Sequence, residues 1–244
     1  MICDLSFPHG VSVNDGIRAS EYLGNSIDLS YPMVDSLAAR LKVLGPGCYV
    51  GKKDLKKAYR QFLLDPRDIH LTGYCWKDQI YLDLALVMGA RSAAYLCQRV
   101  TNAVSFIASQ KGVFVINYLD DLCMVSLPSE ASHSFEILTK LLDDLGLVEA
   151  VDKSVEPSTK VEFLGVQFDT EAQTMEVTPS RLEEIHDLIL VWLQKKTATK
   201  KELQLLIGKL NFICKCVFSS RVFICRLLGV LRQLKRQSHR FRLN

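Results

Sequence analysis

The chain has 244 residues, of which 48% are hydrophobic and 23% charged, and its formal net charge is +3. This composition is typical of a globular protein and excludes a disordered or collagen-like chain. The start, MICDLSFPHG, lacks the basic segment and apolar run of a signal peptide, and no stretch approaches the roughly eighteen apolar residues of a membrane span. We therefore expect an intracellular protein, cytoplasmic or nuclear, that is neither secreted nor bound to a membrane.

The charge is distributed unevenly. Residues 195–244 contain 13 Lys and Arg against one acid, Glu202, which leaves 17 basic and 26 acidic residues in the first 194. A basic terminal section on an acidic body predicts contact with a polyanion, and nucleic acid is favoured over a membrane because no lipidation motif is present. A solvated helix face rich in Lys and Arg is the alternative interpretation.

The eight cysteines form no CxxC pair, and most lie in apolar strings. Reduced thiols that pack as small hydrophobes are the first interpretation. A zinc site is the alternative, but the spacing of its four candidate ligands matches no common site: Cys214, Cys216, Cys225 and His239.

The first part of the chain predicts short elements between turns. A helix is expected at about residues 32–44, after apolar segments interrupted by turn formers. GCYVGKKDLKKAYRQFLL then passes from a short strand with Tyr49 and Val50 into a polar turn and a helical patch, and Asp54 lies at the change of period. HLTGYCWKDQIYLDLAL predicts a β-hairpin with WKDQ at its bend and aromatic residues on its flanks.

Helices and strands alternate in the remainder. A helix is predicted from about Ala93, followed by two apolar strands, VFVINY and CMVSL, and by the helix SEASHSFEILTKLLDDLG, which ends at Gly146. Two further strands are expected in VEFLGVQFD and TMEVT. From Thr178 the pattern predicts helices to the end of the chain, with Pro179 in a first turn, Thr199 before a second helix and a third segment at about 219–237.

The tetrapeptide LDDL occurs twice, at 119–122 and 142–145, in different settings. The second copy ends an amphipathic helix, so Asp143 and Asp144 are expected to be solvated. Asp120 and Asp121 in the first copy lie at the tip of an apolar hairpin, where adjacent carboxylates repel each other unless a cation compensates them. Asp54, at the end of another strand, is a natural partner, and three carboxylates predict a site for two Mg²⁺ ions and phosphoryl-transfer chemistry.

Five motifs in order then resemble the reverse transcriptase domain of a retroelement, nearest to the tyrosine-recombinase (DIRS-like) retrotransposon group. They are KKDLKKAYRQF, YLDLALVMGARSAAYLCQRV, NYLDDL, VDKS and FLGVQF, and KKELQLLIGKLNFICK is similar to the first helices of the thumb. The resemblance implies an α+β right-hand polymerase fold. Its palm has an antiparallel sheet packed on helices, and the implied parts are partial fingers at 1–29, palm at 30–61 and 93–176, a fingers hairpin at 62–92, and a helical thumb with the start of the connection at 177–244.

The resemblance also implies a role for each matched residue. Asp54, Asp120 and Asp121 would hold two Mg²⁺ ions, with Mn²⁺ as a substitute, and the Leu55 carbonyl would complete one shell. Tyr59 would exclude a 2′-OH, and Gly89 would let backbone approach the nascent base pair. Lys153 would protonate the leaving pyrophosphate. The primer end would be held by Phe163, Leu164 and Gly165.

The implied activity is RNA-directed DNA polymerisation, with dNTPs added to the 3′-OH of a primer on an RNA or DNA template. Prolines common in the second motif are replaced by Val87 and Ala94, and the basic residues that precede ICDLSFP in the family would lie upstream of Met1. The sequence is therefore expected to be a piece of a longer polyprotein that includes an RNase H domain. A catalytically impaired nucleic-acid-binding fragment is the alternative function.

Overall fold

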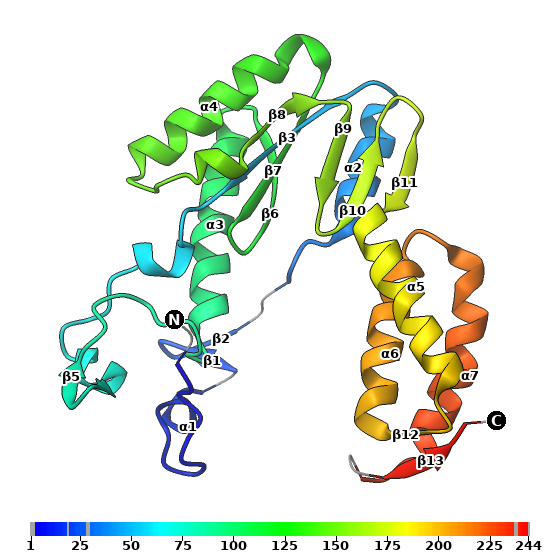
Figure 1. The fold of residues 1–244 in the computed structure, drawn as a ribbon. Helices are drawn as coiled ribbons and strands as arrows, with labels where there is room; N and C mark the ends of the chain where they lie inside the picture. The colour runs from blue at the N-terminus through cyan, green and yellow to red at the C-terminus, as the bar shows by residue number, and fades with distance from the viewer. Residues whose placement is uncertain (1–2, 19, 28–29, 237–238, 244) are drawn as a thin grey trace. The chain divides into compact units, whose positions relative to one another are not determined.

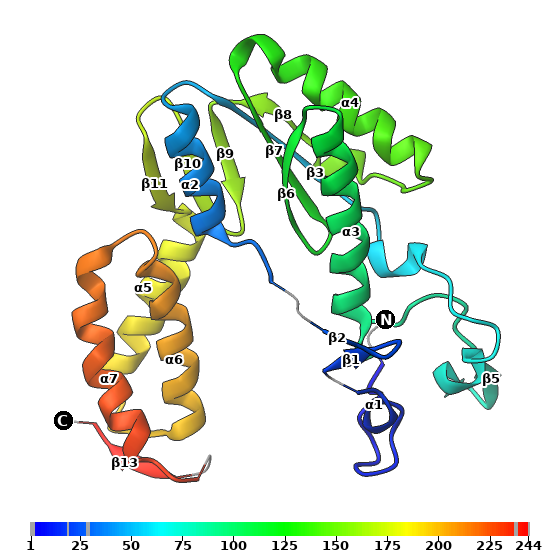
Figure 2. The ribbon, with the colours of Figure 1, turned by 180° about the vertical axis from the view of Figure 1, so that it is seen from behind.

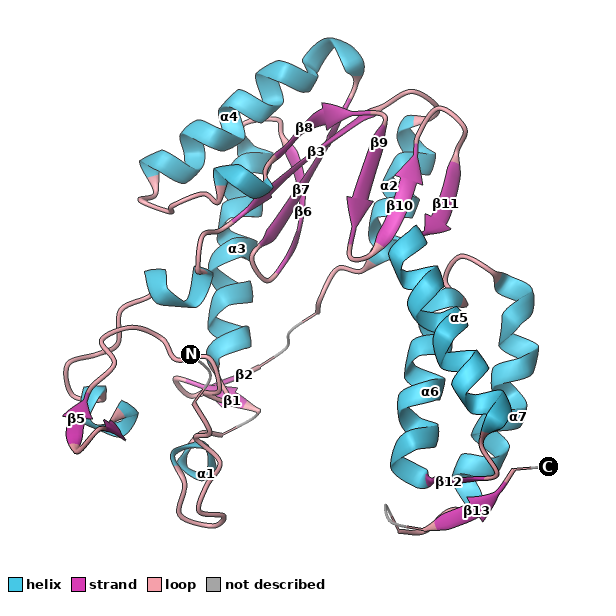
Figure 3. Cartoon of the chain, in the orientation of Figure 1, coloured by secondary structure: helices cyan, strands magenta, loops and turns pink. Residues whose placement is uncertain are grey.

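The computed structural model describes residues 3–18, 20–27, 30–236 and 239–243 (Figure 1). The chain divides into two compact units, the first formed by Met1–Val161 and Thr170–Gln173 and the second by Glu162–Asp169 and Thr174–Asn244. Helices and antiparallel strands occur in both units (Figure 3). The predicted α+β class is therefore confirmed.

The first unit is built on a four-stranded antiparallel sheet with the order β6-β7-β3-β8. Its strands are β6 (Phe114–Tyr118), β7 (Asp121–Ser126), β3 (Tyr49–Asp54) and β8 (Val155–Ser158). β7 is buried along nearly its whole length because it lies between β6 and β3 and is contacted by helices α2 (Val34–Leu44) and α4 (Ala131–Asp144). The predicted hairpin of VFVINY and CMVSL is confirmed, and β3 ends at Asp54, where the sequence predicts the end of a strand followed by a turn.

Helices α3 (Ala93–Gln110) and α4 (Ala131–Asp144) pack against the sheet (Figure 2). Both are amphipathic, and their apolar stripes meet side chains from β6 and β7 in one core cluster. The predicted start at Ala93 is confirmed, and α4 ends at Asp144, two residues before Gly146, which takes a positive φ of 69° as a C′ glycine does. Helix α2 (Val34–Leu44) also contacts β7.

Smaller elements complete the first unit. They are α1 (Val13–Gly16), the pair β1 (Glu21–Tyr22) and β2 (Asn25–Ser26), and the predicted hairpin of β4 (Tyr74–Trp76) and β5 (Gln79–Tyr81). Short 3₁₀ helices occur at Ala58–Gln61, Ile69–Thr72, Pro128–Glu130 and Val151–Lys153. The expected helical patch after Asp54 is thus a single 3₁₀ turn.

A three-stranded sheet with the order β11-β10-β9 leads into the second unit. Its strands are β9 (Lys160–Phe163), β10 (Val166–Asp169) and β11 (Thr174–Val177). VEFLGVQFD was expected to contain one strand, and it contains parts of two. The reason is the two-residue turn at Leu164 and Gly165, whose positive φ angles of 50° and 76° reverse the chain.

The second unit continues with α5 (Pro179–Gln194), α6 (Lys200–Ile213) and α7 (Arg221–Gln233), which share one apolar cluster. Pro179 is in the first turn of α5, and the Thr199 side chain caps α6, as the sequence predicts. A further 3₁₀ turn occupies Phe218–Ser220.

The prediction of helix to the end of the chain is wrong. Strand β12 (Thr197–Thr199) pairs with β13 (Arg240–Arg242) after α7 has ended at Gln233. β-Branched threonines favour an extended backbone, and pairing directs Phe241 onto the apolar cluster of the helices. The last residue of the predicted third segment, Gln237, lies outside the described residues.

All eight cysteines are free thiols, and four of them are buried: Cys48, Cys97, Cys123 and Cys214. Burial raises the pKa of the Cys123 thiol to about 12, which keeps it protonated. Cys214, Cys216, Cys225 and His239 all lie within the described residues, where no group of three potential metal ligands occurs. No helix in the described ranges is both long and apolar enough to cross a membrane.

Candidate active site

The ends of β3 and β7 bring the predicted carboxylates together. Asp54 and Asp121 are directly opposite each other in the antiparallel register, and Asp120 is in the turn that precedes β7. Directly opposite residues in such a ladder have Cβ atoms about 4.5–5.5 Å apart. The Leu55 amide donates to the Asp120 carbonyl at 3.1 Å, which fixes the turn against the end of β3.

The turn that carries Asp120 is held by a buried polar side chain that sequence reasoning missed. Gln98, on α3, is 0% exposed, and its Oε1 accepts a hydrogen bond from the Leu119 amide at 2.7 Å. Its Nε2 donates to the Asn117 carbonyl at 3.1 Å and to Asn102 at 2.8 Å. Leu119 has a positive φ of 52°, which is uncommon for a residue with a side chain. The Gln98 contacts therefore stabilise an unfavourable backbone conformation next to the carboxylates.

Two lysines pair with the carboxylates. The Lys153 Nζ is 3.2 Å from both carboxylate oxygens of Asp54, and the Lys52 Nζ is 2.9 Å from Asp121 Oδ1. Lys153 reaches Asp54 across 99 residues because the Ala150 amide donates to the Asp54 carbonyl at 2.8 Å and anchors the 3₁₀ turn Val151–Lys153 there. The pKa of Lys153 is raised, chiefly by its hydrogen bond to Asp54.

The electrostatic environment of Asp120 differs from that of the other two carboxylates. Burial raises the pKa of the Asp120 carboxyl, a backbone hydrogen bond opposes this, and the nearby Asp54 and Asp121 carboxylates raise it further. Lys153 lowers the pKa by a smaller amount. A partly desolvated carboxylate beside two others is a site that an added cation would stabilise.

The donor set fits a divalent cation by its chemistry. Three carboxylates supply the hard oxygen ligands that Mg²⁺ and Mn²⁺ bind. No three acidic, histidine or cysteine side chains in the part of the chain described here surround a common position, and the two ammonium groups now supply the compensating charge. Lys153, with its side chain 60% exposed, can leave Asp54 without losing buried contacts.

A cavity of about 630 Å³ opens beside Asp120. Its lining includes four residues singled out from the sequence: Leu55, Tyr59, Asp120 and Lys153. Its volume lies in the range typical of small-molecule sites, about 300–1,000 Å³. Burial raises the pKa of Tyr59 to about 12, so the phenol is neutral and presents an uncharged ring and hydroxyl. The cavity can therefore hold a molecule of nucleotide size next to a carboxylate and a lysine.

A family model described as "Reverse transcriptase (RNA-dependent DNA polymerase)" matches residues 7–168, which is more than half of the chain. The chain belongs to the reverse transcriptase family. A comparison with curated protein sequences finds no match.

Solved structures of foamy virus protein resemble this reverse transcriptase domain. A foamy viral protease-reverse transcriptase in complex with double-stranded DNA has a TM-score of 0.65 and 17% identity, over 97% of this chain and 42% of that one. The protein in complex with an RNA/DNA hybrid has a TM-score of 0.59 and 19% identity, over 77% of this chain and 24% of that one. The likeness confirms the polymerase fold, and the domain spans less than half the length of both structures.

Gly89 of the reverse transcriptase domain is needed for a close approach of backbone. Its φ is +124°, and a Cβ there would be 2.0 Å from the Cys3 carbonyl oxygen. The Cys3 amide donates to the Met88 carbonyl at 2.9 Å, and Asn14 Nδ2 donates to the Gly89 carbonyl at 2.9 Å. The segment that packs on Gly89 is thus the N-terminal one, which the sequence alone did not indicate.

The remaining predicted residues lie elsewhere. Phe163 is fully buried in β9, and Leu164 and Gly165 form the turn that follows it, in the second unit. A Cβ on Gly165 would be 3.2 Å from the Phe212 ring. Asp143 and Asp144 are exposed at the end of α4, as the second LDDL copy predicts.

Proposed function

We propose that this reverse transcriptase domain is an RNA-directed DNA polymerase of a retrotransposon, nearest to the tyrosine-recombinase (DIRS-like) group. One observation carries the proposal: the register of β3 and β7 sets Asp54 beside Asp121, while Asp120 faces a cavity of nucleotide size. The order of the five motifs along the chain supports the retrotransposon assignment.

The proposed reaction adds a dNTP to the 3′-OH of a primer. Asp54, Asp120 and Asp121 would hold the divalent ions, two Mg²⁺ or Mn²⁺, which would supply the positive charge needed to acidify the 3′-OH and to stabilise the departing pyrophosphate. Lys153 is charged and lines the cavity, so it can give a proton to the pyrophosphate. Tyr59 lines the same cavity, and its ring would meet the sugar of the bound nucleotide and exclude a 2′-OH.

The backbone has proposed roles too. The Leu55 carbonyl is at the end of β3 next to Asp54 and is available as a further oxygen ligand. Gly89 would approach the nascent base pair, held in position by the N-terminal segment. In the second unit, Phe163, Leu164 and Gly165 would support the primer end.

The proposed partners are an RNA or DNA template with its primer and dNTPs. Two foamy virus structures whose fold is shared hold double-stranded DNA and an RNA/DNA hybrid, which supports this class of partner. Residues 1–29 and 62–92 would act as fingers, 30–61 and 93–176 as palm and 177–244 as thumb, within a longer product that carries an RNase H domain.

A non-catalytic nucleic-acid-binding role is the second candidate. The ion pairs of Lys153 with Asp54 and of Lys52 with Asp121 favour it, because ammonium groups that stay in place would exclude divalent ions from those carboxylates. The basic section from Lys195 onward would then account for binding alone.

Primer extension on an RNA template with a DNA primer distinguishes the two candidates. We expect Mg²⁺- or Mn²⁺-dependent incorporation whose products follow the template sequence, and a loss of at least about 100-fold in Asp54→Asn. Asp144→Asn, which changes an exposed carboxylate on α4, is the matched control and should extend normally. Binding of template-primer, measured by fluorescence anisotropy, should be retained in both variants. Wild type that extends no better than Asp54→Asn would reject the polymerase assignment.

A further inference from the structure

The β4–β5 hairpin gathers three aromatic side chains on one face. The turn residues Lys77 and Asp78 have positive φ angles of 49° and 60°, the geometry of a tight two-residue hairpin. Tyr74 is opposite Tyr81, and Trp76 is opposite Gln79. Because side chains alternate between the faces of a strand, these four residues share one face. The Tyr74 and Tyr81 rings are nearly parallel, at 17°, with centroids 5.5 Å apart.

This aromatic face is open to solvent. Trp76 is 63% exposed and Tyr81 is 40% exposed. Large aromatic side chains usually contribute to a core or an interface, because each removes a large apolar area from water when it is covered. An exposed tryptophan and an exposed tyrosine on the same face of the hairpin therefore indicate a surface that binds something.

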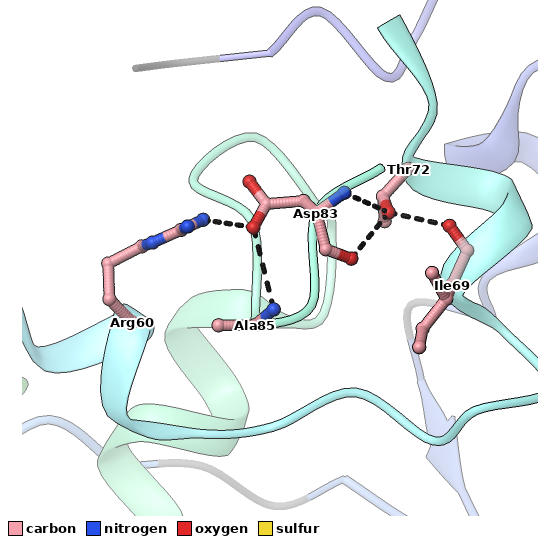
Figure 4. A network of polar contacts seen from close by, with 5 residues as sticks. All are labelled: Arg60, Ile69, Thr72, Asp83 and Ala85. Atoms are coloured by element: carbon pink, nitrogen blue, oxygen red, sulfur yellow. Dashed lines mark hydrogen bonds and ion pairs between the residues drawn. The ribbon is translucent and has the colours of Figure 1, made fainter. Parts of the chain in front are cut away.

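The base of the hairpin is fixed rather than loose (Figure 4). The Thr72 hydroxyl donates to the Asp83 carbonyl at 2.9 Å and lies within 2.7 Å of the Ile69 carbonyl. The buried Asp83 carboxylate accepts hydrogen bonds from Arg60 and, at 3.4 Å, from the Ala85 amide. These hydrogen bonds hold the base of the hairpin in place. Because the hairpin is already ordered, its aromatic face would lose less conformational entropy on binding.

The aromatic face continues from the candidate active site. Tyr74 lines the same cavity as Asp120, together with Leu82 and Asp83 at the end of the hairpin. The cavity wall also carries three cationic side chains, Lys57, Arg60 and Lys153, of which Arg60 pairs with Asp83 and Lys153 with Asp54. Cations next to exposed flat rings are the combination by which proteins bind single-stranded nucleic acid, since phosphates meet the cations and bases stack on the rings.

We propose that the face formed by Tyr74, Trp76 and Tyr81 is a stacking platform for unpaired bases of a single strand that enters or leaves the cavity. This proposal depends on the proposed function in one respect, that the cavity beside Asp120 binds a nucleotide. A polynucleotide is favoured over a protein partner because the face adjoins the cation-lined cavity. Trp76 is the outermost ring of the three, beside the turn, and Tyr74 is the one that reaches the cavity.

The test measures binding without catalysis. A labelled oligo-dT is titrated with wild type, Trp76→Ala and Tyr81→Ala, with fluorescence anisotropy as the readout and without dNTP or divalent ion. Loss of one stacked base costs roughly 1–3 kcal/mol, so each variant should bind about 5- to 150-fold more weakly. Phe106→Ala, which removes a ring that is 66% exposed on α3, is the matched control and should bind as wild type does.

A second readout reports on Trp76 directly. The chain has two tryptophans, so a Trp192→Phe variant leaves Trp76 as the sole tryptophan fluorophore. Its emission should be quenched by the single strand, and less by a blunt duplex of the same length.

Three outcomes would overturn the proposal. The first is a change in oligonucleotide affinity below twofold in both hairpin variants, and the second is a loss of affinity in Phe106→Ala as large as in those variants. The third is a shift from dimer to monomer in Trp76→Ala with unchanged oligonucleotide affinity. The last would make the face a protein contact. Wild type that extends no primer, with weaker oligonucleotide binding in Trp76→Ala, would reject the polymerase assignment and leave the platform standing.

Discussion

Replacing Gln98 with leucine should loosen the turn that carries Asp120. The change keeps a similar side-chain volume but leaves the Leu119 amide without its acceptor and removes one donor to the Asn117 carbonyl. An orphaned, largely buried donor costs about 1–3 kcal/mol and a lost net hydrogen bond about 1 kcal/mol, so we expect the free energy of unfolding to fall by about 2–4 kcal/mol. Leu119, at a φ of 52°, would then relax toward a commoner conformation and carry Asp120 with it.

Urea unfolding and single-nucleotide incorporation test these expectations together. A shift of about 1 Å in a reacting group can cost roughly 100-fold in rate, so Gln98→Leu should lose far more activity than its folded fraction accounts for. Gln110→Leu, at the exposed end of the same helix, is the matched control. The reasoning is refuted if Gln98→Leu unfolds within about 0.5 kcal/mol of wild type and incorporates nucleotide at the wild-type rate.

Three other predictions concern separate parts of the chain. Gly89→Ala places a Cβ 2.0 Å from the Cys3 carbonyl oxygen, so it should release the N-terminal segment, seen as faster amide exchange there; unchanged exchange would contradict the close approach. Hydrogen bonds from Lys195 and Thr199 lower the pKa of Glu202 to about 2 from 4.5, so its stabilisation is complete above pH 4.5 and is lost as pH falls toward 2. In Glu202→Gln the free energy of unfolding should therefore fall less between pH 4.5 and 2 than it does in wild type. The same fall in both proteins would show that Glu202 does not contribute this stabilisation. Template-primer affinity should fall steeply as the salt concentration rises. Neutralising three exposed cations, Lys201, Arg226 and Arg232, should make the slope of log affinity against log salt concentration shallower by up to about 3. An unchanged slope would exclude these cations from the interface.

The sequence predicts the candidate site well where local pattern determines position. Asp120 and Asp121 are predicted at the tip of a hairpin because two apolar strands flank them and the few residues between these strands can form only a tight turn. Their approach to Asp54 follows once β3 and β7 are neighbours, which the resemblance to reverse transcriptases implied and the register bears out. The exposure of Asp143 and Asp144 follows from helix periodicity alone.

What the sequence did not reveal depends on contacts between distant residues. Gln98 reads as one polar residue on an amphipathic helix, and only the packing of α3 on β6 shows that its side chain holds the Leu119 amide. The pairing of Lys153 with Asp54 spans 99 residues and likewise has no local signature. Strand β13 was missed because its three residues are extended only by virtue of their partner β12.

Single-turnover incorporation tests whether the carboxylates at the ends of β3 and β7 carry out nucleotidyl transfer. A complex of the protein with RNA template and DNA primer is formed first, and one complementary dNTP is added with Mg²⁺. We expect rapid extension by wild type and by Asp143→Asn, and at least about 100-fold slower extension by Asp120→Asn in an equally populated complex. Equal rates in wild type and Asp120→Asn, or an equal loss in Asp143→Asn, would contradict this expectation.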